Sequence, residues 1–515
     1  MTSVFPGNRV CAVVAGATAA EAKRQFRLAV GNRYRAGVVE LRLDYLQTDE
    51  ERSAFLHWLS RQRRRPTRIA TCRRRAGGGR FSGDVDGELA ILGEAARAGC
   101  SWCDVEIETA ERLKLATLRK ALAPAKLLIS AHDFRGMPRS LPPLLGKLKR
   151  CGADAIKLSA ACQTLGDVRQ LLAPARTRRD FVAIPMGDTG EGVRVLALRE
   201  GSALAYASVV DVVAPGQLSI DAMLRVYRLG RRFGASAGGP TRGTRVYAVV
   251  GDPIGHSLSP LMHNAAFAAR GENAVYLPFR VRQLDDFIEA VRAFGISGFS
   301  VTLPHKERVL DYLDGCDPLA AEIGAVNTVA VRGGNRLYGY NTDYAGVLRA
   351  IKRHVPLARS RVLLLGAGGS ARAAAFALAR SGAAVVIWAR REEKARALAR
   401  ASGGEAISRT VLRREKFDAI VNCTPVGMHP GGGSPLKSGE LNARVVMDLI
   451  YRPRRTDLLK LAERRGIATI SGVEMFLAQG AAQWEIWNKR RAPRDVMRRA
   501  VVAALADEER ALARR

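Results

Sequence analysis

The stretch Arg361–Arg372, RVLLLGAGGSAR, decides the fold class of the second half of the chain. The apolar run RVLLL has the character of a buried strand, and the segment after GAGGSAR is rich in Ala and favours a helix. A glycine-rich turn between a strand and a helix lets the backbone approach a pyrophosphate, which binds at the helix N-terminus. This context predicts a nucleotide-binding lobe of the Rossmann type. A tight turn without a ligand is the alternative. The residues expected to bind the cofactor are Gly366, Ala367, Gly368, Gly369 and Ser370.

The next predicted strand, Ala383–Ala389, indicates which nucleotide is bound. It is followed by Arg390, Arg391 and Lys394, where a site for NAD would place an acidic residue on the ribose. Because cations at this position favour a 2′-phosphate, we expect NADP(H) as the cofactor. An ordinary solvated basic loop is the alternative.

The first half of the chain alternates short apolar runs with segments of helical period. Eight strands, each followed by a helix, predict a (β/α)8 barrel, whose chemistry lies at the carboxyl ends of the strands. The expected strands are Val10–Ala15, Val38–Leu43, Arg68–Cys72, Trp102–Ile107, Lys126–Ala131, Ala155–Leu158, Phe181–Pro185 and Leu204–Val209.

The halves are separated by RFGASAGGPTRGT, a stretch of Gly, Ser, Ala and Pro without periodicity. We therefore predict a barrel over 1–231, a linker over 232–244 and a two-lobed α/β unit after it. In that unit, a substrate lobe spans 245–345 and the Rossmann lobe spans 346–475. C-terminal helices over 476–515 are expected to return to the substrate lobe.

The chain of 515 residues carries a formal net charge of +33, which raises the hypothesis of nucleic-acid binding. Arg is spread over the whole chain without aromatic interleaving, so a compositional bias explains the charge better, and no nucleic-acid partner is expected. No apolar run approaches the about 20 residues that cross a bilayer, and the N-terminus has no signal-peptide pattern. We expect a cytoplasmic protein with free thiols, no metal site and no membrane partner. The oligomeric state is left open.

Lys157 in ADAIKLSA lies within an apolar strand, where an ammonium group is costly. Burial and neighbouring cations would lower the pKa of this side chain and give the free amine that forms a Schiff base. A lysine that snorkels at a strand end is the alternative. His132 in LLISAHDF ends another strand and suits a general base, with Asp133 beside it to set its tautomer or orientation.

The strand ELRLD places three charged side chains, Glu40, Arg42 and Asp44, at alternating positions, and we expect them on one face. A carboxylate and a guanidinium there can hold substrate hydroxyls or a carboxylate, although a structural ion pair is the alternative. Arg73 and Arg194 offer further contacts to an anion.

The strings ELRLD, TCR, SAHDF, DAIKL and APGQ (214–217) resemble the type I 3-dehydroquinate dehydratases in order and spacing. The resemblance implies that Lys157 forms an iminium with the substrate ketone, that His132 removes the adjacent proton, and that 3-dehydroshikimate is formed without a cofactor. The substrate-binding residues that it implies are Glu40, Arg42, Arg73, Arg194 and Gln217.

Two positions depart from that family. Gly77 stands where the family places a Glu that helps to orient the catalytic His, and Val213 replaces a Ser. We expect either a slower dehydratase or another residue, such as Asp84 or Asp86 on the nearby loop, that supplies the carboxylate. A degenerate, non-catalytic barrel is the alternative.

In the second half, polar groups follow predicted strands in GHSLSP, SVTLPHK, GAVNT and NTD. A Lys and Asp pair, Lys306 with Asp343, can relay the proton that accompanies hydride transfer to a carbonyl. These strings, with NCTPVGM, DLIYRP and GVEMFLAQ, resemble shikimate dehydrogenase over residues 246 to 490. The resemblance implies that Lys306 and Asp343 are catalytic and that Gly472 and Leu449 line the nicotinamide. The residues it implies for binding shikimate are Ser257, Ser259, Thr302, Asn327, Tyr451 and Gln479.

The order of the two halves is similar to that of the fused dehydratase and dehydrogenase of plants. It predicts a bifunctional enzyme that acts on 3-dehydroquinate, 3-dehydroshikimate and shikimate. A shikimate or quinate dehydrogenase with an inactive barrel is the alternative.

Overall fold

The computed structural model describes residues 4–5, 9–62, 66–187, 189, 191–210, 216–229, 239–255, 257–429 and 431–513. These residues form two compact units, each continuous in space but not in sequence. The first unit comprises Met1–Tyr247, Pro253–Pro260 and Gly271–Gly295, and the second comprises Ala248–Asp252, Leu261–Arg270 and Ile296–Arg515.

The first unit contains the predicted barrel. Its strands pair in parallel in the order β7-β6-β5-β4-β3-β2-β1-β8, and β8 also contacts β7. All eight predicted strands are confirmed, with starts that differ by at most one residue and carboxyl ends that differ by one to three. They are β1 (Val10–Val14), β2 (Val38–Arg42), β3 (Thr67–Thr71), β4 (Trp102–Glu106), β5 (Lys126–Asp133), β6 (Ala155–Ala161), β7 (Phe181–Met186) and β8 (Ala205–Ser208). The short β9 (Leu218–Ser219) pairs with β8.

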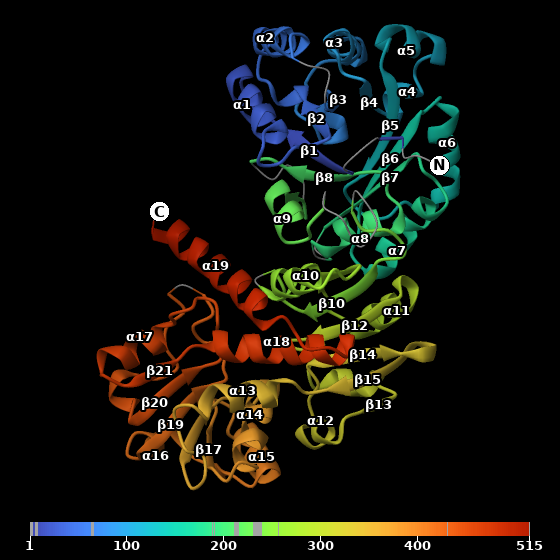
Figure 1. Cartoon of the computed structure of the whole chain (residues 1–515). Helices are drawn as coiled ribbons and strands as arrows, with labels where there is room; N and C mark the ends of the chain where they lie inside the picture. The colour runs from blue at the N-terminus through green and yellow to red at the C-terminus, as the bar shows by residue number, and fades with distance from the viewer. Residues whose placement is uncertain are drawn as a thin grey trace. The chain divides into compact units, whose positions relative to one another are not determined.

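Helices lie outside the strands of the barrel (Figure 1). Side-chain caps set the starts of several of these helices: the hydroxyl of Thr18 accepts from the Glu21 N–H, and that of Thr48 accepts from the Glu51 N–H. The helices are α1 (Ala19–Val30), α2 (Asp49–Ser60), α3 (Val85–Arg97), α4 (Ile107–Ala110), α5 (Leu115–Leu122), α6 (Leu141–Arg150), α7 (Leu165–Leu172), α8 (Gly192–Glu200) and α9 (Ile220–Arg225).

The segment Gly271–Gly295, which follows the linker in sequence, packs on the barrel within the first unit. It contains β11 (Ala274–Arg280) and α11 (Leu284–Phe294). The carboxylate of Asp286 accepts hydrogen bonds from the backbone N–H groups of Leu165 at 2.7 Å and Gly166 at 3.0 Å. Both donors lie in the first turn of α7, where N–H groups have no partner inside the helix. A residue from beyond the linker therefore caps a barrel helix.

A six-stranded sheet follows, in the order β11-β10-β12-β14-β15-β13. Strand β10 (Arg245–Gly251) contributes its first three residues to the first unit and its last four to the second. The other elements of this region are α10 (Ser259–Ala269), β12 (Ile296–Val301), β13 (Gly315–Cys316), α12 (Pro318–Ile323), β14 (Thr328–Arg332), β15 (Arg336–Tyr340) and α13 (Asp343–Ile351).

The Rossmann lobe is a parallel sheet in the order β18-β17-β16-β19-β20-β21, with an apolar core on each face. The strand order reverses between β16 and β19, which is where nucleotides bind in such sheets. Its elements are β16 (Arg361–Leu365), α14 (Gly369–Ala379), β17 (Ala384–Trp388), α15 (Glu392–Ser402), β18 (Glu405–Ala406), α16 (Arg409–Leu412), β19 (Phe417–Asn422), β20 (Ala443–Asp448), α17 (Asp457–Arg464) and β21 (Ala468–Ile470).

Two long helices end the second unit, α18 (Gly472–Asn488) and α19 (Arg494–Ala513). Helix α18 packs against α13 and contacts β12 and β14, and Figure 1 shows it running along this part of the unit. None of the helices in the described ranges is both long and apolar enough to cross a membrane.

Candidate active sites

Lys157 lies on β6 inside the barrel, with only 2% of its side chain exposed. Its Nζ donates a short hydrogen bond to Asp104 and lies 3.4 Å from Glu40 Oε1. The charged groups in direct contact with this amine are therefore carboxylates, and the expectation of neighbouring cations is wrong. An amine must be unprotonated to attack a ketone, and these carboxylates are the groups in contact that can accept its proton.

Asp104 on β4 was not among the expected site residues. It is buried, and it accepts from Lys157 and from Nη2 of Arg73 at 3.4 Å. Burial alone would raise the pKa of Asp104, but the charges of Lys157 and Arg73 lower it below its usual range. The sequence WCDVEIE carries the signal that was missed: two acidic residues alternate within an apolar strand, as in ELRLD.

His132 lies near the end of β5, and its Nδ1 is 3.1 Å from Glu106 Oε2. Asp133, which we expected to set the tautomer or orientation of His132, instead holds its own turn. Its Oδ1 accepts from the backbone N–H groups of Arg135 and Gly136. The successive side chains of a strand point to opposite faces, which explains why the sequence neighbour is not the partner. Burial and the charge of Arg73 lower the pKa of His132.

Glu106 on β4 connects His132 with Arg73, whose Nε donates to Glu106 Oε1 at 2.5 Å. Burial alone would raise the pKa of Glu106, but Arg73 and His132 lower it to about 2. The two residues expected to supply this carboxylate do not contact His132. Asp84 caps α3 by accepting from the Gly87 N–H, and Asp86 is exposed in the first turn of α3.

The strand β2 ends at Arg42, so the alternation expected for ELRLD stops there. Asp44 lies in a 3-10 turn over Leu43–Tyr45 and accepts two hydrogen bonds from Arg42, at 2.9 and 2.8 Å. Glu40 instead faces Lys157 and accepts from Thr71 Oγ1 at 2.9 Å. Glu40 and Arg42 therefore have different partners rather than forming one cluster with Asp44.

The remaining barrel candidates, Arg194 and Gln217, are both buried. Arg194 lies in α8, and burial lowers the pKa of its guanidinium to about 10. Val213 lies outside the described residues, as do residues 214 and 215 of APGQ. Within the described part of the barrel, the structure brings Glu40, Arg73, His132 and Lys157 together around Asp104 and Glu106.

In the second unit, Lys306 Nζ lies 2.5 Å from Asp343 Oδ2. Asn327 Nδ2 donates to the other oxygen of Asp343 at 2.7 Å and to Thr342 Oγ1 at 2.9 Å. Lys306 Nζ also donates to Ser370 Oγ at 3.0 Å. The predicted Lys and Asp pair is therefore held between an amide of the substrate lobe and the glycine-rich turn of the Rossmann lobe.

Three further candidates for shikimate binding lie on loops or at a helix start. Thr302 follows β12, where its N–H bonds the carbonyl of Val250. Ser259 is the buried first residue of α10 in the first unit. Ser257 Oγ accepts from the Ser259 N–H at 3.3 Å, so this hydroxyl also shapes its own turn.

The loop after β20 meets the start of α18. A Cβ on Gly472 would lie 2.5 Å from the Leu449 carbonyl oxygen, so only glycine fits. The ring of Tyr451 stacks on that of Phe476 at 4.0 Å. Gln479 Nε2 donates to the Phe476 carbonyl. Leu449, Tyr451, Gly472 and Gln479 are thus close neighbours in this part of the second unit.

The glycine-rich turn fits a dinucleotide. Gly366 has φ of 110°, which favours glycine, and a Cβ on Gly368 would meet nothing within 4 Å. These features leave room for a phosphate beside the N-terminus of α14. Arg390, Arg391 and Lys394 are exposed after β17. An anionic 2′-phosphate suits this group of cations.

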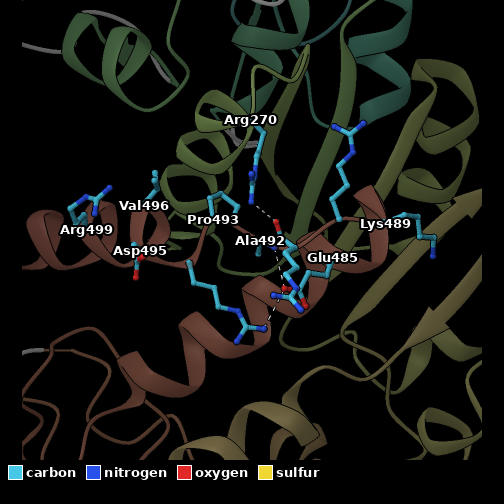
Figure 2. Close-up of a pocket in the computed structure, with 11 residues that line it drawn as sticks. Arg270, Glu485, Lys489, Ala492, Pro493, Asp495, Val496 and Arg499 are labelled. Carbon is cyan, nitrogen blue, oxygen red and sulfur yellow. Dashed lines mark hydrogen bonds and ion pairs between the residues drawn. The ribbon is translucent and has the colours of Figure 1, made fainter.

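A surface pocket of about 1020 Å³ lies where α18 ends and α19 begins, and Figure 2 shows Arg270, Glu485 and Lys489 among its lining side chains. Glu485 there accepts from the Ala492 N–H. None of the predicted catalytic, substrate or cofactor residues lines this pocket.

Sequence models of known families match both halves of the chain. The model of type I 3-dehydroquinase matches residues 10–232. The shikimate dehydrogenase substrate binding domain matches residues 249–329, and the shikimate 5′-dehydrogenase C-terminal domain matches residues 472–502.

A curated relative spans both halves. The bifunctional 3-dehydroquinate dehydratase/shikimate dehydrogenase, chloroplastic, of Arabidopsis thaliana is 34% identical over 486 residues, which cover 90% of this chain and 79% of the relative. This chain belongs to the same bifunctional family. In this bifunctional dehydratase/dehydrogenase, Lys157 and His132 lie within the residues that the dehydroquinase model matches. Lys306 lies within the residues that the substrate binding domain matches.

Monofunctional relatives match the second half of the bifunctional chain. Shikimate dehydrogenase (NADP(+)) of Methanothermobacter thermautotrophicus is 44% identical over 279 residues, which cover 51% of this chain and 97% of the relative. A crystal structure of shikimate 5-dehydrogenase from Thermus thermophilus, in complex with NADP(H) and shikimate, is 36% identical. It covers 51% of this chain and 100% of its own, with a TM-score of 0.47.

Proposed function

We infer that the barrel dehydrates 3-dehydroquinate to 3-dehydroshikimate and that the second half reduces this product to shikimate with NADPH. The observation that carries the proposal is the presence, in one chain, of both built sites. In the barrel, a buried lysine contacts Asp104 and a histidine contacts Glu106. In the second half, a Lys and Asp pair adjoins the glycine-rich turn.

In the barrel, Lys157 passes a proton to a neighbouring carboxylate, Asp104 or Glu40, and its amine attacks the ketone carbon of the substrate. The ketone oxygen takes one proton from the attacking nitrogen and the other back from the carboxylate, so that it leaves as water and an iminium forms. His132 then removes the proton on the adjacent carbon, and the electron pair expels the hydroxyl group beyond it. The same imidazole gives its proton to the departing hydroxyl, which leaves as water. Hydrolysis of the iminium releases the product and restores Lys157.

The positive groups of the barrel orient the substrate in this proposal. Arg42, Arg73 and Arg194 are buried, so their charges are poorly screened by water. With Glu40 and Gln217 they bind the carboxylate and hydroxyls of the ring through charge-assisted hydrogen bonds.

In the second half, Lys306 donates a proton to the carbonyl oxygen, and Asp343 holds the lysine in place. Asn327 fixes Asp343 by donating to its second oxygen. NADPH supplies the hydride when it is bound. Within the second unit, the residues that hold the ring are Thr302, Tyr451 and Gln479, and those that line the nicotinamide are Leu449 and Gly472. The phosphates bind residues 366–370 with Arg390, Arg391 and Lys394. The roles of Ser257 and Ser259 stay predictions from the sequence.

A coupled assay tests both steps. The purified full chain receives 3-dehydroquinate and NADPH, and oxidation of NADPH is followed together with formation of 3-dehydroshikimate. We expect Lys157→Ala to abolish turnover of 3-dehydroquinate while the chain still reduces added 3-dehydroshikimate. Lys306→Ala should accumulate 3-dehydroshikimate.

Borohydride separates this proposal from a dehydrogenase with an inactive barrel. Reduction in the presence of 3-dehydroquinate should leave a covalent adduct on Lys157 of the wild-type chain. No adduct would contradict the dehydratase assignment, whatever the second half does. The domain boundaries, a cytoplasmic location and the lack of a nucleic-acid partner stay predictions from the sequence.

A further inference from the structure

The contacts of His132 identify which of its nitrogens acts as the base. Glu106 is held ionised by Arg73 and His132, and an ionised carboxylate can only accept hydrogen bonds. The hydrogen between Glu106 and Nδ1 therefore belongs to the imidazole. This leaves the lone pair on Nε2, the nitrogen that is turned away from Glu106.

Glu106 also occupies the space beside Gly77. A Cβ on Gly77 would lie 3.5 Å from Cδ and Cγ of Glu106 and 3.5 Å from Cγ of Arg73, in ordinary van der Waals contact. Gly77 does not have a positive φ, so its backbone accepts a side chain. A carboxylate attached at position 77 would start from this same corner of the barrel, next to Arg73 and Glu106.

We propose that Glu106 is the positioning residue of His132 in the dehydratase: it fixes the Nδ1–H tautomer and the ring orientation from the corner that Gly77 leaves open. This role rests on the proposed dehydratase function. Glu106 does not touch the reacting atoms; it acts through the imidazole and is itself held by Arg73 and by Ser130 Oγ at 3.4 Å.

The first test is Glu106→Gln in the full chain. We expect the dehydratase kcat to fall by about tenfold to a hundredfold, as when the partner of a functional histidine is removed. Because the negative charge of Glu106 raises the pKa of His132, its loss should also move the acid limb of the pH–rate profile to lower pH. A residue that only supports the fold would not move this limb.

Three controls are built into the chain. Reduction of 3-dehydroshikimate by the same sample should stay within about twofold, which reports that the protein is folded. Borohydride should still trap substrate on Lys157. Glu108→Gln, the same change at an exposed position on the adjacent α4, should leave the dehydratase unchanged.

The second test introduces a carboxylate at position 77 in place of the one removed at position 106. Gly77→Glu in the Glu106→Gln background should recover at least tenfold of the lost kcat and restore the acid limb. Recovery of kcat supports the claim that positions 77 and 106 share one corner beside His132, and failure to recover overturns that part of the proposal.

An unchanged kcat with an unmoved acid limb in Glu106→Gln overturns the role of Glu106. Loss of trapping in parallel with kcat also overturns it, because Glu106 would then act on Lys157. If the wild-type chain itself gives no adduct, the dehydratase assignment fails instead.

Discussion

Lys306 Nζ contacts two groups from different lobes, lying 2.5 Å from Asp343 Oδ2 and 3.0 Å from Ser370 Oγ. Asp343 begins α13, and Ser370 belongs to the glycine-rich turn that precedes and starts α14. The aliphatic part of the lysine also packs close to Gly369. The proposed proton donor is therefore positioned partly by the segment proposed to bind the cofactor. We expect occupancy of this turn to affect the geometry of the lysine.

Ser370→Ala should lower the dehydrogenase kcat by about tenfold, because a hydrogen bond to a charged group contributes about 1.5 to 3 kcal/mol. Steady-state rates with 3-dehydroshikimate and NADPH measure the change. Ser381→Ala is the matched control. Ser381 lies just after the same helix, and its hydroxyl donates to the Ala377 carbonyl rather than accepting from Lys306. Equal rates in the two variants would contradict a role for Ser370 at Lys306.

Gly472→Ala should impair the dehydrogenase and destabilise the second unit. The added methyl group would overlap the carbonyl oxygens of Leu449 and Ile450, and such overpacking costs about 1 to 3 kcal/mol. The KM for NADPH and the denaturant midpoint of the second unit measure the effect. Gly439→Ala, where a Cβ meets nothing within 4 Å, should change neither quantity. A variant at 472 that behaves like the one at 439 would show that the loop moves freely.

Replacing Arg390 and Arg391 together by Ala should raise the KM for NADPH by about tenfold or more and leave the KM for NADH nearly unchanged. The 2′-phosphate is the only difference between the two cofactors, and it loses two of its three proposed cationic partners while Lys394 remains. Arg396→Ala on α15 is the control, because this exposed side chain pairs with Glu392. A parallel rise of the KM for both cofactors would contradict a specific role of the two arginines at the 2′-phosphate.

The acid limb of the wild-type dehydratase should have its midpoint below the usual histidine pKa of about 6.5. Burial and the charge of Arg73 lower the pKa of His132, so the neutral base persists as the pH falls. Rates of 3-dehydroshikimate formation between about pH 4 and 8 give this midpoint. A midpoint above the usual value would mean that His132 is stabilised as a cation instead.

The strands of both halves could be predicted because their signals are local. A buried strand such as β16 is an apolar run, and its glycine-rich turn has a characteristic composition. The partners of the site residues could not be predicted in the same way. Asp133 is next to His132 in sequence, yet Glu106 from the neighbouring strand meets the ring, since partners in a barrel come from adjacent strands.

The ends of elements also limited the prediction of the site. The expected alternation of Glu40, Arg42 and Asp44 required the strand to continue, and it ends at Arg42. We expected cations near Lys157 because its amine must be unprotonated to form a Schiff base. Asp104 and Glu40 instead place negative charge beside it. The acidic residues of β4 follow the period of a strand, and this pattern was the available signal.

The carboxylate of Asp286 limits where the chain can be cut to give two separate enzymes. A shortened chain that stopped at the linker would keep the Thr164 cap of α7 but lose the two bonds that Asp286 accepts from Leu165 and Gly166. It would also lose the Arg280 N–H that bonds the Thr189 carbonyl. The severed barrel would leave polar main-chain groups to water and expose the flank on which the segment 271–295 packs. Fusion of the two enzymes is thus embedded in tertiary structure, and it goes beyond a tether that keeps two catalysts near each other.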